Sequence, residues 1–306
     1  MKILVTGGNG FIGSHLCRSL LEEEHEVFAL SRNPENERIA SSSERRNFHV
    51  LACDIQDLSK LQEIMETNKI DAVIHLAAYV SEKRMESARN LMCFNTNVKG
   101  TLNVLHACFL SEVSKIIYAS SMGVYGKPEH LPVKENHPRN PLDFYSLTKL
   151  QGENYCNFYA QNYNIHMVVL RYAGVYGTGK NKGAVYNFTR QVLNGENPRI
   201  SSTGNQTRDF VYVKDIVSAT LRALNIIDEI KYDIFNIGSG RETSVNELLD
   251  KIINITGENI DFKYAPEKCA DRFVLDITKA YKVLDYRPRP FDGSLAEFIQ
   301  LVKSGG

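Results

Sequence analysis

The stretch Thr6-Gly7-Gly8-Asn9-Gly10-Phe11-Ile12-Gly13 follows a short apolar run, Ile3–Val5, and opens a helical pattern, Phe11–Leu21. In a turn of this kind one glycine permits the tight bend, a second lets the backbone approach a pyrophosphate, and a third lets helix and strand pack closely. The pyrophosphate lies at the helix N-terminus, where unpaired N–H groups favour negative charge. We therefore expect a dinucleotide cofactor to bind at Gly7, Gly10, Phe11, Ile12 and Gly13.

Working outward from this turn, short runs rich in Val and Ile alternate with helical patterns. The runs are Ile3–Val5, Val27–Leu30, His49–Ala52, Ala72–Leu76, Ile116–Ala119 and Met167–Leu170. Each is apolar at successive positions, as expected for strands that are covered on both faces. Such alternation predicts an α/β fold, a Rossmann-type doubly wound parallel sheet with right-handed crossovers.

After Arg171 the alternation becomes irregular. Gly174–Gly183 is polar and rich in glycine, so it is interpreted as a loop. Two further apolar runs, Phe210–Val213 and Ile234–Ile237, flank a helical pattern. We predict a dinucleotide-binding domain over residues 1–172, to which 208–237 returns, and a smaller, interrupted C-terminal α/β substrate domain over 173–306.

The ends of the later strands suggest the remaining cofactor contacts. A site selective for NAD usually carries an acidic residue about 20 positions after the turn, whereas this chain has Ser31-Arg32. That pair suits a 2′-phosphate and favours NADP over NAD, although Arg32 also fits a solvated loop charge. Asp54, followed by Ile55, is placed to bind adenine, and the small residues in Leu76-Ala77-Ala78 allow the cofactor to lie close.

Tyr145 and Lys149 are four residues apart and therefore share a helix face. An ammonium near a phenol stabilises the phenolate and lowers the phenol pKa from about 10. Such a tyrosine can exchange a proton with a sugar hydroxyl. Ser121 follows the fifth strand, at the edge where doubly wound sheets bind ligands.

Composition argues against several other classes of protein. The chain has 36 Lys and Arg and 36 Asp and Glu, so it lacks the positive excess of a nucleic-acid-binding protein. Its six cysteines form no C-x-x-C pair, which favours free thiols over a zinc site. Because no apolar run approaches the ~20 residues of a membrane span, we expect a cytoplasmic protein with no metal and no membrane or nucleic-acid partner.

Taken together, these motifs resemble the extended short-chain dehydrogenase/reductase superfamily, and within it the NAD(P)-dependent nucleotide-sugar epimerase/dehydratase family. The resemblance covers nearly the whole chain. Besides the glycine turn it rests on His75–Ala78, Asn97–Thr101, Ser120–Gly126, Tyr145–Lys149, Leu170–Tyr172, Arg208–Val213 and Phe235–Gly240.

The resemblance implies roles for individual residues. Ser121, Tyr145 and Lys149 would be the catalytic trio, with Ser121 and Tyr145 also contacting the substrate, and Asn97 would join Tyr145 and Lys149 in binding the cofactor. Gly174, Arg208 and Arg272 would contact the nucleotide-diphosphate sugar, while Ala184–Phe188 and Arg199–Ser201 fall where the family surrounds the base. Helices around Val98–Leu110 and Tyr145–Tyr163 would form a homodimer interface.

The chain departs from the family pattern at three informative places. Near the C-terminus the family's arginine-proline-glycine-aspartate is missing, and Arg272 would take over a phosphate contact. Dehydratases carry acidic residues before Val-Tyr-Gly, where this chain has Met122 and Gly123, so dehydration of the sugar is disfavoured. Gly174 replaces an asparagine, which removes one expected polar contact.

These features favour a nucleotide-sugar epimerase, most often at C4 in this family, that acts by hydride transfer to a tightly bound NAD(P) through a keto-sugar. The alternative is an NADPH-dependent keto-sugar reductase. A 4,6-dehydratase and a catalytically silent NAD(P)-binding protein are less favoured.

Overall fold

The computed structural model describes residues 1–33, 46–80, 87–200, 203–264 and 271–304. Contacts within the chain divide it into two compact units. The first contains Met1–Gly126, Pro138–Arg171 and Val217–Phe235; the second contains Lys127–His137, Tyr172–Ile216 and Asn236–Gly306.

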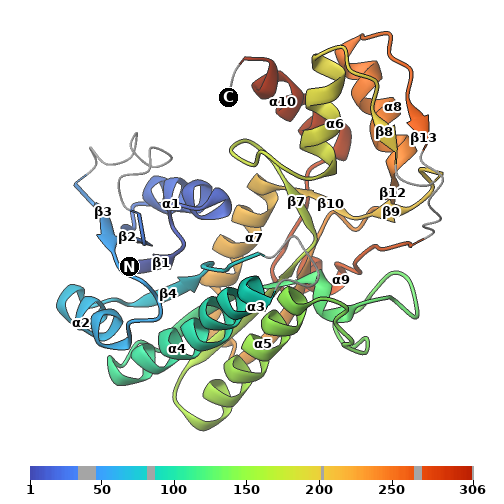
Figure 1. The fold of residues 1–306 in the computed structure, drawn as a ribbon. Helices are drawn as coiled ribbons and strands as arrows, with labels where there is room; N and C mark the ends of the chain where they lie inside the picture. The colour runs from blue at the N-terminus through green and yellow to red at the C-terminus, as the bar shows by residue number, and fades with distance from the viewer. Residues whose placement is uncertain (34–45, 81–86, 201–202, 265–270, 305–306) are drawn as a thin grey trace. The chain divides into compact units, whose positions relative to one another are not determined.

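A seven-stranded parallel sheet forms the centre of the first unit, and only the last residues of β6 and β11 belong to the second (Figure 1). Its spatial order is β11 (Tyr232–Ile237), β6 (His166–Tyr172), β5 (Lys115–Ser121), β4 (Ala72–His75), β1 (Lys2–Thr6), β2 (Glu26–Ser31) and β3 (Phe48–Ala52). The order reverses between β1 and β4, which makes the sheet doubly wound and places a ligand crevice at the carboxyl ends of these strands. The predicted Rossmann-type α/β class is confirmed.

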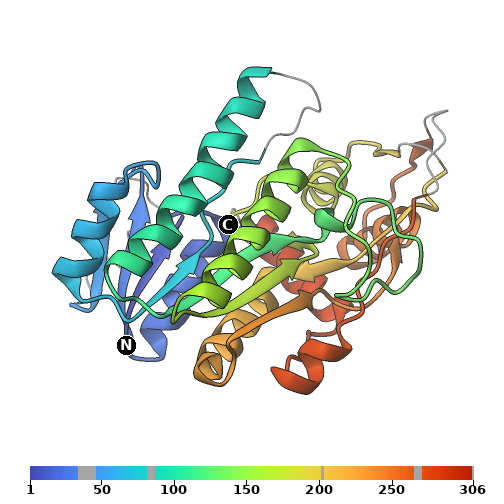
Figure 2. The same cartoon turned by 90° about the horizontal axis from the view of Figure 1, so that it is seen from below.

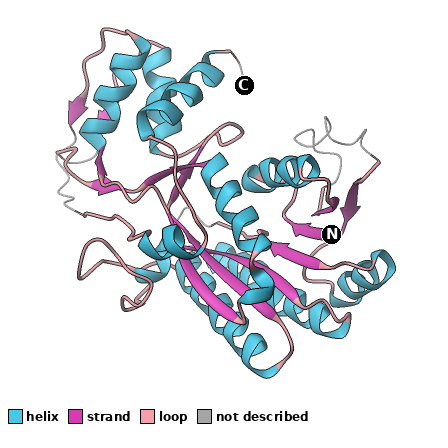
Figure 3. Ribbon diagram, turned by 180° about the vertical axis from the view of Figure 1, so that it is seen from behind, coloured by secondary structure: helices cyan, strands magenta, loops and turns pink. Residues whose placement is uncertain are grey.

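Helices cover both faces of this sheet. One face packs against α2 (Leu58–Asn68), α4 (Gly100–Leu110) and α5 (Phe144–Asn162), with a continuous apolar core that includes Leu4, Val73, Ile116, Leu61, Val104 and Cys156. On the other side α1 (Phe11–Glu22) packs against β1 and β2, and Figure 3 shows the sheet from behind. Adjacent residues of β1, β2, β4, β5 and β6 are buried, as the uninterrupted apolar runs predicted, whereas β3 is the edge strand and only its Phe48 is buried.

A π-helical segment, η2 (Phe94–Lys99), connects α3 (Ser87–Cys93) to α4. Sequence patterns predicted one helix beginning near Val98 and gave no indication of this wider turn. Segments of π-helix occur frequently at functional sites. Here η2 carries Asn97, whose side chain is fully buried.

Small sheets and helices make up the second unit. The sheets pair β7 (Gly174–Tyr176) with β10 (Phe210–Tyr212), β9 (Thr207–Arg208) with β12 (Thr243–Ser244), and β8 (Arg199–Ile200) with β13 (Lys263–Tyr264). The unit's helices are α6 (Ala184–Leu193), α8 (Val245–Thr256), α9 (Thr278–Val283) and α10 (Phe291–Lys303). A further helix, α7 (Val213–Asn225), begins here and continues into the first unit, where η4 (Ile227–Glu229) follows it.

Two details of the second half differ from the sequence prediction. Gly174–Tyr176, expected within a loop, is a strand that pairs in parallel with Phe210–Tyr212. Of the two runs expected to return to the large sheet, only β11 does so, because Phe210–Tyr212 takes β7 as its partner instead.

Five cysteines, Cys17, Cys53, Cys93, Cys108 and Cys156, are free thiols and are buried; Cys269 lies outside the described residues. No helix in the described ranges combines the length and the apolar character that crossing a membrane would require.

Candidate active site

The glycine turn connects β1 to α1 and lies close to the end of β4. Gly7 has a φ of +70°, and a β-carbon there would lie 2.9 Å from the backbone nitrogen of Ala77. At Gly13 a β-carbon would lie 2.2 Å from the carbonyl oxygen of Gly7. Gly10 is the N-cap of α1 and has no side chain to cap its first turn, and a helix N-terminus favours an anion. Asn9 Oδ1 is buried there without a partner among the described residues. The turn thus fits the diphosphate of a dinucleotide.

Replacing Gly13 with alanine is expected to disrupt this turn, because the atom in the way is a backbone oxygen that cannot rotate aside. We predict that bound nicotinamide nucleotide is lost and that unfolding becomes easier by ~1–3 kcal/mol. Released nucleotide and urea unfolding provide the two readouts. Gly293→Ala is the matched control, since Gly293 lies in α10 with nothing within 4 Å of its added β-carbon. Equal nucleotide content in both variants would contradict the prediction.

The residues expected to contact the adenosine half lie at the carboxyl ends of β2 and β3. The Ser31 hydroxyl hydrogen-bonds the backbone of Asn33, and Arg32 is exposed. The Asp54 carboxylate accepts the backbone N–H of Gln56 at 2.9 Å. Ile55 is buried against Gly100, where a β-carbon would lie 2.5 Å from its Cδ1.

At the end of β4, His75 is fully buried between two threonines. Its Nδ1 lies 2.6 Å from Thr6 Oγ1 and its Nε2 lies 3.0 Å from Thr101 Oγ1. Burial, and then the charge of Lys149, lower the pKa of His75 to about 3, so the ring is neutral. Thr6 Oγ1 also accepts the backbone N–H of Ala77, which fixes the segment Leu76–Ala78 beside the glycine turn.

Ser121, Tyr145 and Lys149 come together in the first unit. Ser121 ends β5, and its side chain hydrogen-bonds that of Tyr145 and accepts the N–H of Gly123. Asp143 caps α5 by accepting the Ser146 N–H at 2.8 Å, so the helix begins immediately before Tyr145. Lys149, one turn later, is 2% exposed. Ser121 and Tyr145 thus meet through a hydrogen bond at the end of β5, and Lys149 lies one helical turn from Tyr145 on α5.

The expected effect of Lys149 on the phenol is not found. Burial raises the pKa of Tyr145 to about 12, and the Ser121 hydrogen bond is the contact that opposes this rise. Burial also lowers the pKa of Lys149 to about 8. Desolvation penalises the charged form of each group in this buried site.

A buried ion pair beneath the trio was not predicted. Glu153 continues the helix face of Tyr145 and Lys149 and is fully buried. Its carboxylate accepts two hydrogen bonds from Arg171, at 2.9 and 2.7 Å, and one from Ser120 at 2.5 Å. Arg171 also donates to the Tyr125 hydroxyl. Burial disfavours its charge, but the bonds to Glu153 raise the pKa of Arg171 above its usual value.

Asn97 connects three segments around the trio. Its side chain donates to Thr148 Oγ1 on α5 at 2.9 Å, accepts the backbone N–H of Tyr79 at 2.7 Å, and donates to the Tyr79 carbonyl. Both donor and acceptor groups of the Asn97 amide therefore form hydrogen bonds within the protein. The structure therefore gives Asn97 a role in fixing the segment after β4 to α5.

The three residues expected to bind the substrate outside the trio lie in the second unit. A β-carbon at Gly174 would lie 2.9 Å from the Asp209 carbonyl oxygen, so the chain packs closely at this position. Arg208 donates to the carbonyls of Thr207 and Asp271. The Arg272 guanidinium forms two hydrogen bonds with Glu242, at 2.5 and 2.6 Å, so its charge is paired within the protein.

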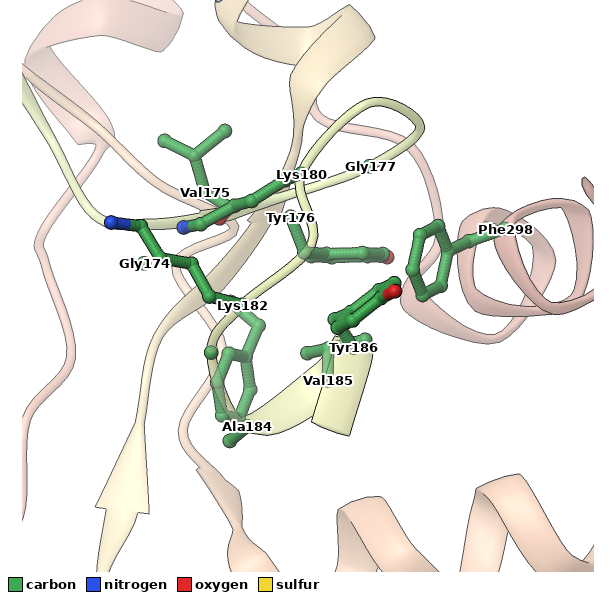
Figure 4. Close-up of a pocket in the computed structure, with 12 residues that line it drawn as sticks. Gly174, Val175, Tyr176, Gly177, Lys180, Lys182, Ala184, Val185, Tyr186 and Phe298 are labelled. Atoms are coloured by element: carbon green, nitrogen blue, oxygen red, sulfur yellow. The ribbon is translucent and has the colours of Figure 1, made fainter. Parts of the chain in front are cut away.

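A pocket of about 110 Å³ lies in the second unit beside β7 and the start of α6. Aromatic side chains of Tyr176, Tyr186 and Phe298 lie on one side of it and Lys180 and Lys182 on the other (Figure 4). Burial, and then the neighbouring Lys182, lower the pKa of Lys180. The pocket includes Ala184 and Val185 from the segment expected to surround the base, while Ser201 from the other such segment lies outside the described residues.

Comparison with known proteins matches residues 3–238 to the model of the NAD dependent epimerase/dehydratase family. A Methanocaldococcus jannaschii protein, provisionally named a UDP-glucose 4-epimerase, is 40% identical over 299 residues, covering 94% of this chain and 93% of that protein.

Solved structures of UDP-sugar 4-epimerases are also similar to this chain. The UDP-glucose 4-epimerase of Thermotoga maritima with UDP-glucose has a TM-score of 0.87 at 32% identity, covering 100% of this chain and 99% of the other. A variant of the UDP-glucuronic acid 4-epimerase of Bacillus cereus, with a fluorinated UDP-sugar and NAD, has a TM-score of 0.91 at 30% identity and covers 100% of both chains.

Proposed function

The chain belongs to the NAD dependent epimerase/dehydratase family, and from this premise we propose that it is a nucleotide-sugar 4-epimerase that keeps NAD bound through turnover. The observation that carries the proposal is the convergence of Ser121, Tyr145 and Lys149 in the same unit as the glycine turn. Relatives that match the whole chain and act at C4 of UDP-sugars support it.

In this mechanism the chain's own residues bind the sugar and move a proton. Tyr145 Oη, as the phenolate, accepts the proton of the C4 hydroxyl when the alcohol is oxidised and returns it when the ketone is reduced. Ser121 hydrogen-bonds the same region, which holds the reacting oxygen in place. When bound, NAD supplies the hydride acceptor and donor that converts the C4 alcohol to a ketone and back. Lys149, one helical turn from Tyr145, supplies a positive charge that stabilises the phenolate.

Packing at Gly123 supports an epimerase over a dehydratase. A β-carbon at this position would lie 2.2 Å from Ser146 Oγ, and that hydroxyl is held by Asp143. An acidic side chain at position 123 would therefore force the Ser146 hydroxyl to move and break its hydrogen bond to Asp143. This packing adds a steric reason to the absence of the acids needed to eliminate water.

The pocket beside β7 suits the nucleotide half of the substrate. Aromatic side chains offer stacking surfaces for a base. An anionic phosphate near Lys180 and Lys182 would offset the effects of burial and of the neighbouring Lys182, which lower the pKa of Lys180. We propose a uridine nucleotide, because the relatives named above act on UDP-sugars. UDP-glucose and UDP-glucuronic acid are the first substrates to test.

We propose NAD as the cofactor, since the Bacillus cereus structure holds NAD and the expectation of NADP finds no support in the comparisons. Denaturing the purified protein and separating the released nucleotides should give NAD at close to one per chain. An empty protein that binds added NADPH would contradict the proposal and favour the keto-sugar reductase.

We also propose that the chain forms a homodimer through α3, η2, α4 and α5, which lie side by side in Figure 2. Large apolar side chains on these elements are exposed: Leu91, Met92, Phe94, Leu102, Phe109, Leu110, Leu147 and Phe158. Leu147 and Phe158 are eleven residues apart on α5 and so share a face. A second copy packed there would form a four-helix interface.

Phe158→Glu should therefore convert the dimer to a monomer, because Phe158 is 55% exposed in the single chain and a charge would be buried on assembly. Sedimentation equilibrium measures the change. Tyr281→Glu, at an exposed position on α9, is the control and should leave the dimer intact. A wild-type protein that sediments as a monomer would contradict the proposed interface.

The five buried, free thiols are compatible with a reducing compartment. We propose that the enzyme works in the cytoplasm.

A further inference from the structure

Lys149 is a basic side chain that is buried from solvent. Its side chain is 2% exposed, and burial lowers its pKa to about 8. An amine that must remain charged at neutral pH needs compensation from the groups that surround it. The identity of those groups decides how the lysine performs its role in the proposed function.

The face of the Tyr118 ring lies directly against this ammonium. Lys149 Nζ is 4.2 Å from the centroid of the ring, well within the distance at which an aromatic face attracts a cation. Tyr118 is itself 0% exposed. The interaction is therefore desolvated, which is the setting in which cation–π attraction is strongest.

The position of the ring is fixed from several sides. The Tyr118 hydroxyl donates to the backbone carbonyl of Lys149 at 3.4 Å. Gly152, one helical turn later, leaves room for it, since a β-carbon there would lie 2.1 Å from the hydroxyl oxygen. The neutral His75 ring lies 5.7 Å from the Tyr118 ring, centroid to centroid. Burial raises the pKa of Tyr118 well above its usual value, so the ring stays a neutral phenol.

Other titratable groups face Lys149 from the elements packed around it. Glu153 and Cys156 on α5 and Cys93 on α3 favour its charge, whereas His75 on β4 is neutral. Burial raises the pKa of the Cys156 thiol, which is therefore uncharged at neutral pH. The Glu153 carboxylate is already paired with Arg171, which reduces what it can offer Lys149.

We infer that Tyr118 is a positioning residue for Lys149, whose aromatic face holds the buried ammonium in place and in its charged form beneath Tyr145. The significance of this arrangement for turnover rests on the proposed function. The interaction itself does not, because it is a property of the protein without substrate.

The test compares Tyr118→Phe, which keeps the ring, with Tyr118→Leu, which removes it. In protein labelled with ¹³C at lysine Cε, the Lys149 resonance is identified by its absence from Lys149→Met and is titrated by NMR. We expect the pKa of Lys149 to fall by about one unit in Tyr118→Leu, the size of a desolvated cation–π contact. Tyr118→Phe should titrate within a few tenths of a unit of the wild type.

An unchanged Lys149 titration in Tyr118→Leu would overturn the inference, and so would an equal shift in Tyr118→Phe, which would assign the effect to the hydroxyl. Tyr118→Met, whose unbranched and flexible side chain can adapt to the space that the ring leaves, replaces the leucine variant if that one does not fold. The basic limb of the pH dependence of kcat should move with the NMR titration. Because the titration needs no substrate, a protein without epimerase activity would refute the proposed function and still test this inference.

Discussion

Tyr145→Phe is expected to reduce epimerisation of the UDP-sugar substrate by roughly 10²–10⁴-fold, the contribution of a positioned proton-transfer group. The variant loses only the hydroxyl that exchanges the proton, and Ser121 loses its hydrogen-bond partner. Bound NAD should remain at the wild-type level, because the glycine turn is unchanged. Initial rates of epimer formation and the amount of nucleotide released on denaturation measure the two effects separately.

Tyr155→Phe is the matched control for this variant. Tyr155 lies on the same helix and also carries a hydroxyl, but it packs at the edge of the core formed with β-strands and α4. We expect its turnover to stay within about twofold of the wild type, as for a substitution that moves no proton. Wild-type turnover in Tyr145→Phe would refute the assigned role of Tyr145.

Glu153→Ala is expected to lower the free energy of unfolding by about 3–5 kcal/mol, the cost of leaving one member of a buried ion pair without its partner. Arg171 is 1% exposed, so its guanidinium would remain in the interior without the carboxylate that accepts two of its hydrogen bonds. Ser120 would lose its acceptor as well. Urea unfolding, monitored by circular dichroism, measures the change.

Arg139→Ala is the control for Glu153→Ala, because it removes a partly exposed ion pair of the same carboxylate and leaves the buried pair intact. Arg139 faces the same carboxylate at 3.6 Å, but its side chain is 41% exposed, so we expect a loss below about 1 kcal/mol. The double variant Glu153→Met with Arg171→Met should recover much of the stability lost in Glu153→Ala, because no charge is left buried. Equal losses in Glu153→Ala and Arg139→Ala would show that burial of this pair does not control stability.

The first half of the fold could be predicted from local patterns because its strands, apart from the edge strand β3, are covered on both faces. Such strands are continuous apolar runs, and each of the first six predicted runs lies on one of β1 to β6. The glycine turn and the spacing of Tyr145 and Lys149 are equally local, so both were placed correctly on their elements. Strands, turns and helix faces of this kind are determined by residues that are close together in the sequence.

Other features depend on partners that are distant in the sequence. The sequence of Gly174–Tyr176 is typical of a loop, but the segment is a strand because it pairs with Phe210–Tyr212. The pairing of Glu153 with Arg171 spans 18 residues and joins a helix to a strand. A spacing of four from Lys149 to Glu153 was the only signal that could have indicated it. The pKa of Tyr145 could not be read from its neighbours in sequence, because desolvation depends on packing.

Following deuterium at C4 is the most direct test of the proposed 4-epimerase. Purified protein is incubated, without added cofactor, with UDP-glucose or UDP-glucuronic acid that carries deuterium at C4, and the products are examined by NMR. The account predicts the C4 epimer of at least one of them with deuterium still at C4, because the hydride leaves and returns within one active site. An epimer that has lost deuterium to solvent, or no epimer from either sugar, would contradict it.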